Sequence, residues 1–218
     1  FARYLQGLYH YELREWEKAQ KIWEKTLILC KKQTYIAKNN LLAKCYNRLS
    51  TCWYAQNNLP KALHYVEEGL KQYTAEEQDD IKFASLGNKI LYLRKSERRE
   101  EAIKLVKEVW PSINQIQSVS VMLLLYKSYC ILLLENEELD KAFHYCKESI
   151  EIAHRNMSQK NYLLDFLNII GSIYLKQGKF KQALEHFNLV FDLDPEKKFS
   201  RRHADTYTHL TSLYTTQN

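Results

Sequence analysis

The residue types that most often carry enzymatic chemistry are present in this sequence, but none stands in a catalytic or metal-binding pattern. The seven histidines occur singly, without an HExxH motif and without a cysteine at ligand spacing. There is no glycine-rich phosphate loop and no GxSxG motif. The acidic pairs Asp79-Asp80 and Glu137-Glu138 precede predicted helices, where negative charge favours the helix dipole, so we interpret them as capping residues. The sequence therefore predicts no enzyme activity, no metal and no cofactor.

Three asparagines offer a different chemistry, the recognition of a peptide backbone. A side-chain amide has one acceptor and two donors, so it can pair with both the C=O and the N–H of an extended chain. Asn47, Asn88 and Asn168 each lie within an apolar helical pattern. On a shared surface they would hold a peptide with little regard to its side chains. The alternative is that each is simply an exposed polar residue on a helix.

The helices that would position these side chains are clearest between Asn161 and Pro195. Apolar residues from Leu163 to Tyr174 recur at steps of three and four, as on one face of a helix. Gly178 then breaks the pattern, a second apolar stripe follows, and Pro195 ends it. We expect two antiparallel helices in which small Ala183 lies opposite Gly171 at the closest crossing. Tyr174 and Phe187 would fill the space around that crossing.

Imperfect copies of this unit fill the rest of the chain. The alanine of the second helix recurs at steps of 40 to 43 residues, at Ala19, Ala62, Ala102, Ala142 and Ala183. The unit resembles the tetratricopeptide repeat, and the period implies longer first helices than usual. We therefore predict an all-α tetratricopeptide-repeat domain over residues 1–218, a right-handed superhelix of about five and a half antiparallel helix pairs. The expected repeats are about 1–33, 34–75, 76–115, 116–157 and 158–197, with a half repeat at 198–218, as in a piece of a longer protein.

Alignment on the alanines places a set of first-helix residues on the inner surface of the array. Asn47 and Asn168 take the same position in their repeats, and Asn88 lies one step from it. The candidate peptide-binding residues are Lys44, Asn47, Arg48, Tyr54, Asn88, Arg94, Lys127, Asp165, Asn168 and Ser172. The cations among them make the early surface basic, while Asp165 and Asp205 make the far end acidic. A peptide with an acidic group near the second to fourth repeats would complement this gradient.

Composition supports a helical protein of the cytoplasm. Hydrophobic residues make up 45% of the 218 residues, which is ample for a core, and five glycines and three prolines are too few for an all-β fold. The formal charge of +6 is spread along the chain rather than concentrated as in a nucleic-acid domain. The five cysteines form no CxxC pair, which favours reduced thiols. No signal peptide and no apolar run long enough for a membrane span are present.

Two segments carry a resemblance to a narrower family. FARYLQGLYHYELREWEKAQKIWEK and LLAKCYNRLSTCWYAQNNLPKALHYVEEGLKQY resemble the repeat domains of the Gram-positive peptide receptors, the RRNPP family with its NprR, PlcR and Rap members. The resemblance implies a short signalling peptide held in the concave groove, with Asn47, Asn88 and Asn168 as the matching clamp. It also implies quorum sensing through an effector domain outside this chain, a possible homodimer, and DNA contact only through that missing domain.

Two other functions stay open at this point. The array could be a tetratricopeptide scaffold that docks a protein partner without any small signal. It could also be the repeat domain of a Rap-type response-regulator phosphatase, whose catalytic residue would lie outside this chain.

Overall fold

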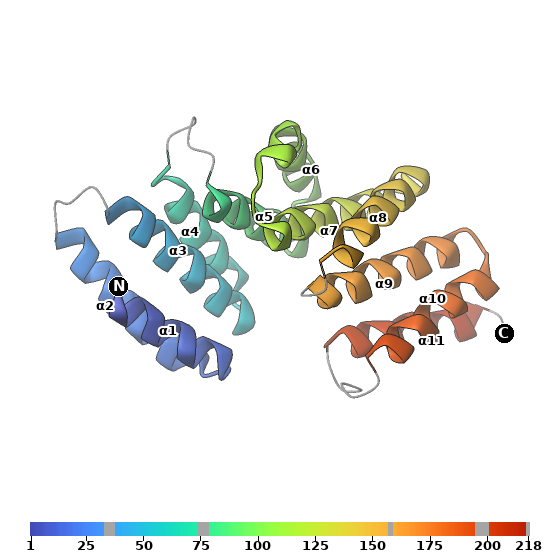
Figure 1. The fold of residues 1–218 in the computed structure, drawn as a ribbon, viewed down its shortest axis with the longest axis horizontal. Coiled ribbons are helices and arrows are strands. Elements are labelled where there is room, and N and C mark those ends of the chain that lie inside the picture. The colour runs from blue at the N-terminus through green and yellow to red at the C-terminus, as the bar shows by residue number, and fades with distance from the viewer. Residues whose placement is uncertain (33–37, 74–78, 157–158, 195–200, 217–218) are drawn as a thin grey trace. The chain divides into compact units, whose positions relative to one another are not determined.

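The computed structural model describes residues 1–218 except 33–37, 74–78, 157–158, 195–200 and 217–218 (Figure 1). Within the described residues the chain forms α-helices and one 3-10 helix, with no strand. The prediction of an all-α protein is confirmed. The residue predicted to end the last complete helix pair, Pro195, falls outside the described residues.

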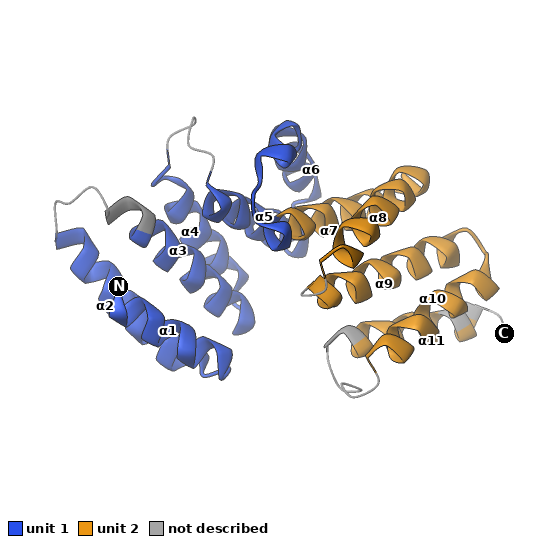
Figure 2. Ribbon diagram, in the orientation of Figure 1, with its two compact units in different colours: residues 1–121 blue, residues 122–218 orange. Residues whose placement is uncertain are grey.

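The chain divides into two compact units, residues 1–121 and residues 122–218 (Figure 2). Unit 1 contains α1 (Ala2–Glu12), α2 (Trp16–Lys32), α3 (Lys38–Ala55), α4 (Leu59–Leu70), α5 (Asp80–Lys95), α6 (Arg99–Val109) and the 3-10 helix η1 (Trp110–Gln115). Unit 2 contains α7 (Val119–Glu135) apart from its first turn, α8 (Leu139–His154), α9 (Lys160–Lys176), α10 (Phe180–Leu193) and α11 (Arg201–Thr216). Helices that follow one another pack in pairs, and within unit 1 the first helices α3 and α5 also touch.

Each turn inside a helix pair uses one residue in the left-handed region. These residues have φ between 58° and 70° and each lies five positions before a repeat alanine: Arg14, Asn57, Glu97, Glu137 and Gly178. The next residue donates its N–H five positions back, as in Lys179 N to Tyr174 O at 2.9 Å. This is the Schellman motif that closes a helix. Glycine and asparagine adopt this region most readily, so Gly178 and Asn57 mark their turns in the sequence, whereas Arg14, Glu97 and Glu137 do not.

Of the two acidic pairs expected to cap a helix, one provides the cap and the other does not. The Asp79 carboxylate accepts the N–H of Ile81 at 2.6 Å, which confirms its capping role. Glu138 precedes α8 but makes no side-chain cap bond, and Glu137 is the left-handed residue of the turn. The capping interpretation of that second pair is therefore wrong. The short Asp side chain reaches the first turn of a helix, whereas Glu138 accepts from Lys141 on the helix surface instead.

The closest crossings pair a glycine with an aromatic ring. A Cβ on Gly171 would lie 2.3 Å from Cε1 of Phe187, and a Cβ on Gly7 would lie 2.2 Å from Nε1 of Trp23. The expectation that Ala183 faces Gly171 is therefore wrong: Ala183 is buried, but Phe187 occupies the space above the glycine. A glycine leaves room for a whole ring, which buries more apolar surface than a methyl group does.

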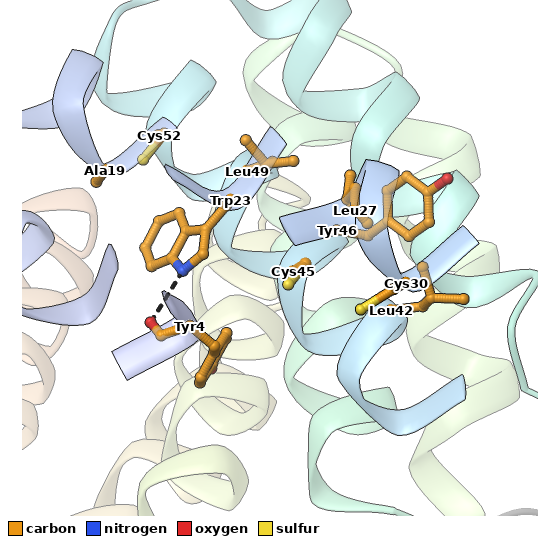
Figure 3. Close-up of a cluster of buried hydrophobic side chains, with 10 residues drawn as sticks. All are labelled: Tyr4, Ala19, Trp23, Leu27, Cys30, Leu42, Cys45, Tyr46, Leu49 and Cys52. Atoms are coloured by element: carbon orange, nitrogen blue, oxygen red, sulfur yellow. Dashed lines mark hydrogen bonds between the residues drawn. The ribbon is translucent and has the colours of Figure 1, made fainter. Parts of the chain in front are cut away.

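The indole of Trp23 anchors the core of unit 1. Its Nε1 donates to the backbone oxygen of Tyr4 at 3.2 Å, so the polar end of a fully buried ring is satisfied (Figure 3). Ala19, Leu49 and Cys52 belong to the same buried cluster, which joins α1, α2 and α3.

The two crossing positions hold different residues in each repeat, and in the first and fifth repeats a glycine is matched with a large ring. Residues twelve before and four after each repeat alanine are Gly7 and Trp23, Ser50 and Val66, Ile90 and Val106, Cys130 and Cys146, and Gly171 and Phe187. All five cysteines are buried free thiols, and those of Cys130 and Cys146 touch each other. Cysteine thus serves as a small core residue, at these crossing positions in Cys130 and Cys146 and at other buried positions in the remaining three.

Candidate functional site

In unit 1 the first helices meet through a pair of asparagines. Asn47 on α3 is only 8% exposed, and its Oδ1 accepts a hydrogen bond from Nδ2 of Asn88 on α5 at 2.8 Å. The hydroxyl of Ser50 donates to the backbone oxygen of Asn47 at 2.7 Å and fixes the same turn of α3. The structure thus brings together two of the three predicted asparagines. This contact uses the acceptor of Asn47 and one donor of Asn88.

Two cations lie on the same stretch of α3. Lys44 and Arg48 are half-buried and one helical turn apart, on either side of Asn47. The Arg48 guanidinium lies over the ring of Tyr11 on α1, 5.8 Å from its centroid. Neither cation forms an ion pair with any residue that the structure describes. The two charges therefore remain available to an anion from outside.

The other predicted residues of unit 1 flank this centre. Tyr54 stacks on Tyr92 of α5, with ring centroids 5.0 Å apart. Tyr92 is buried, and burial raises the pKa of its hydroxyl. Arg94 lies half-buried in the last turn of α5. Together with the asparagines, these residues form what we call the first-helix face of unit 1, defined by Lys44, Asn47, Arg48, Tyr54, Asn88 and Arg94.

In unit 2 the predicted charges neutralise each other. Nζ of Lys127 on α7 lies 2.9 Å from Oδ2 of Asp165 on α9, and the same amine lies 5.4 Å from the ring centroid of Tyr162. We expected Lys127 to extend the basic end and Asp165 to begin the acidic end. The structure instead joins them, because the residue at this place on one first helix reaches the next first helix. The gradient in that form is wrong for unit 2.

Asn168 is also tied to a neighbouring first helix. It is 6% exposed, and its Oδ1 accepts from the hydroxyl of Thr206 on α11 at 2.8 Å. The hydroxyl of Ser172 donates to the backbone oxygen of Asn168 at 2.9 Å and lies 3.4 Å from the ring nitrogens of His209. Asn168 and Ser172 are thus brought together, but the acceptor of the asparagine is engaged within the fold.

His209 completes this cluster. Its ring stacks on Phe187 at 5.4 Å between centroids, nearly parallel. Burial lowers the pKa of His209, and the charge of Asp205 opposes that shift. The sequence analysis missed Thr206 and His209, because it placed Asp205 on the inner surface. No fixed spacing marked Thr206 in the sequence, because it lies 38 residues from Asn168 whereas Asn88 lies 41 residues from Asn47.

These contacts share one geometry, which we call the first-helix ties. Asn47 bonds to Asn88, Lys127 to Asp165 and Asn168 to Thr206, across separations of 41, 38 and 38 residues. In each case the residue fifteen before a repeat alanine reaches the next first helix within its unit. Polar residues at these positions therefore hold successive repeats together, and the alternative that Asn47 and Asn168 are simply exposed polar residues is wrong, because both are buried.

Neither a metal site nor a membrane-spanning helix occurs among the described residues. No group of His, Cys, Asp or Glu side chains among them could hold a metal ion. No helix in the described part of the chain is long and apolar enough to cross a membrane. Burial raises the pKa of the Cys45 and Cys52 thiols to about 12, so both are protonated at neutral pH.

No protein-family model and no curated protein matches the sequence. Solved structures do match the fold. NprR in complex with its cognate peptide NprX superposes with a TM-score of 0.74 at 14% identity, over 99% of this chain and 61% of that chain. The apo form of RapI gives 0.74 at 14% identity, over 99% and 82% of the two chains.

A third match names the repeat type directly. TTC0263, a thermophilic TPR protein of Thermus thermophilus, gives a TM-score of 0.66 at 14% identity, over 96% of this chain and 98% of its own. The chain therefore has the tetratricopeptide-repeat fold, and its fold resembles those of RapI and NprR.

Proposed function

We propose that this chain is a peptide-sensing regulatory domain that binds a short signalling oligopeptide in extended form on its first-helix face. The observation that carries the proposal is the Asn47–Asn88 pair. Its hydrogen bond leaves the side-chain NH2 group (Nδ2) of Asn47 and the side-chain oxygen (Oδ1) of Asn88 without a partner among the described residues. One donor group and one acceptor therefore stand side by side on neighbouring helices.

An extended peptide matches this arrangement. Each of its residues presents one N–H and one C=O, and a buried amide that pairs with both loses no hydrogen bond when water is displaced. The bond between Asn47 and Asn88 orients both side chains before a ligand arrives, which reduces the entropy lost on binding. The proposed clamp therefore reads the backbone, and residues around it would select the sequence.

The same pair suggests how binding would be transmitted. Asn47 belongs to α3 and Asn88 to α5, so a ligand bound to both side chains would bridge two repeats and bias the contact between them. A shift in that contact would alter an effector domain outside this chain, either a DNA-binding domain or a helical bundle of the Rap type. Binding of NprX by NprR, a protein with this fold, supports the proposal. We take residues 1–218 as one repeat array with the boundaries expected above.

The test is direct peptide selection. A pooled library of free pentapeptides is mixed with the purified chain, and bound peptides are identified by mass spectrometry after gel filtration. The parent should retain a subset, and Asn47→Ala and Asn88→Ala should each weaken retention about tenfold, the effect of roughly one lost hydrogen bond to a buried group. Asn188→Ala is the matched control, because Asn188 is exposed on the second helix α10.

The proposal fails if the parent retains no peptide, or if Asn47→Ala and Asn88→Ala retain as much as Asn188→Ala does. Circular dichroism of each variant separates a lost site from a lost fold. Removal of the Asn47–Asn88 bond should cost only about 1 kcal/mol of stability, so both variants should stay folded.

A second function is favoured by one other observation, an apolar stripe on α1. Phe1, Leu5, Tyr9 and Leu13 recur every four residues and are between 48% and 73% exposed. Such a stripe fits a scaffold that docks a protein partner or a second copy of the chain. In that case Leu5→Ser and Tyr9→Ser would abolish the association, measured by analytical ultracentrifugation, while Asn47→Ala would leave it unchanged.

A further inference from the structure

We infer that the ligand of the first-helix face carries a carboxylate, bound by Lys44 and Arg48 beside Asn47. The inference rests on the proposed function and names the class of peptide. It begins from the two cations on α3, which are about 6 Å apart along the helix axis, one turn. Both are half-buried, so a negative group between them would be attracted more strongly than at an open surface.

Two other half-buried lysines that the structure describes are already paired with carboxylates, Lys89 with Glu67 at 3.0 Å and Lys127 with Asp165 at 2.9 Å. Lys44 and Arg48 have no such partner among the residues described. Half-buried charges without counter-ions weaken a fold, and a bound carboxylate would remove that penalty.

Arg48 is also held in position. Its guanidinium lies over the Tyr11 ring, and that ring packs edge-on against Trp16 with centroids 4.9 Å apart. A cation over an aromatic face keeps its N–H groups in the guanidinium plane free, and these match the two oxygens of a carboxylate. Lys44 would supply a second, less directional contact.

No other repeat has this arrangement. The equivalent positions, eighteen and fourteen before the repeat alanine, hold Phe1 and Leu5, Ala84 and Asn88, Leu124 and Ser128, and Asp165 and Ile169. In unit 2 the nearby cation Lys127 is neutralised by Asp165. Among these positions, only those of the second repeat thus hold two cations one turn apart, Lys44 and Arg48 on α3.

The source of the carboxylate is restricted by its distance from Asn47. The amide that would bind the peptide backbone lies within one turn of both cations. The anionic group must therefore lie close to the backbone, as an Asp or Glu side chain or the terminal carboxylate does. These two sources present the same chemistry, and the library design separates them.

The experiment uses two pentapeptide pools of the same composition, one of free acids and one of C-terminal amides, selected at low and at moderate salt. If side chains supply the group, peptides retained by the parent should be enriched in Asp and Glu in both pools. If the terminus supplies it, free acids should be retained over amides. In either case the double variant Lys44→Gln/Arg48→Gln should reduce the preference for peptides that carry the carboxylate about tenfold. Moderate salt should reduce the same preference in the parent.

Two further variants keep the result interpretable. Arg48→Lys retains the charge but loses the planar fork, so it should lower the preference while leaving the fold intact. Lys71→Gln removes an exposed lysine that already pairs with Glu68 and should change nothing. Peptides retained without any bias toward carboxylates would overturn this inference and leave the proposed function standing. If the parent retains no peptide at all, the proposed function itself falls.

Discussion

The contact between Gly171 and Phe187 makes a quantitative prediction about stability. A Cβ at position 171 would lie 2.3 Å from the Phe187 ring, whereas ordinary contact begins near 3.4 Å, so the ring must retreat by about 1 Å. Phe187 is fully buried and stacks on His209, which leaves it little room. Gly171→Ser should therefore cost about 1–3 kcal/mol from overpacking, even though serine favours the helix by about 0.5 kcal/mol over glycine.

A smaller residue at position 187 should restore part of the stability that Gly171→Ser loses. Phe187→Val alone leaves a cavity above the glycine and should cost about 2–3 kcal/mol. The double variant recreates the residue types that the second repeat holds at these two positions, Ser50 and Val66. Its loss should be smaller than the sum of the single losses by at least about 1 kcal/mol.

Urea unfolding provides the assay. Far-UV circular dichroism follows the helices of both units, while the tryptophans at 16, 23, 53 and 110 all lie in unit 1. Tryptophan fluorescence therefore reports unit 1, and a change at Gly171 should move the dichroism transition more than the fluorescence transition. Additive losses, with a coupling energy below about 0.5 kcal/mol, would refute the size-compensation reasoning.

Three other measurements test the fold and one tests the thiols. Glu137→Gly should raise stability by about 0.5–1 kcal/mol, because residue 137 has φ of 62° and a side chain is strained there; thermal melting measures the gain. Lys127→Gln should cost about 1 kcal/mol in low salt and less in high salt, because it leaves Asp165 without its partner. Burial lowers the pKa of His209, so the folded state binds fewer protons than the unfolded state. Stability should fall as pH drops below the unfolded value of about 6.5, and His209→Gln should remove that part of the acid loss. Cys45, whose thiol has its pKa raised to about 12, should react with a thiol reagent at pH 8 only after unfolding.

The fold was predictable from the sequence because the same spacing of alanine and apolar residues recurs in every repeat. Five alanines at nearly equal spacing fix the register, and the apolar steps then fix the helices. Three of the five turns were less visible, since Arg14, Glu97 and Glu137 adopt the left-handed region without being glycine or asparagine. Tertiary packing there outweighs the local cost of a side chain.

The candidate site was predictable only in part. Helical register placed Asn47 and Asn88 on neighbouring first helices, but it could not show that they bond to each other. Nor could it show that Lys127 forms an ion pair with Asp165, because the register position of a charged residue does not give the distance to charged residues on the next helix. The pairing of side chains across helices depends on the distance between helices, which the sequence does not state.

The first-helix ties have a consequence for how such a chain can be cut and recombined. A helix pair looks like the natural exchangeable module, yet Asn47, Lys127 and Asn168 each make their polar bond to the pair that follows. If one helix pair alone were transferred to another repeat protein, its buried asparagine or its ion-pair partner would lose the residue to which it bonds in the following pair. The exchangeable module is therefore the junction, from the middle of one first helix to the middle of the next. Chimeras joined within first helices at matched tie residues should fold better than chimeras joined in the loops.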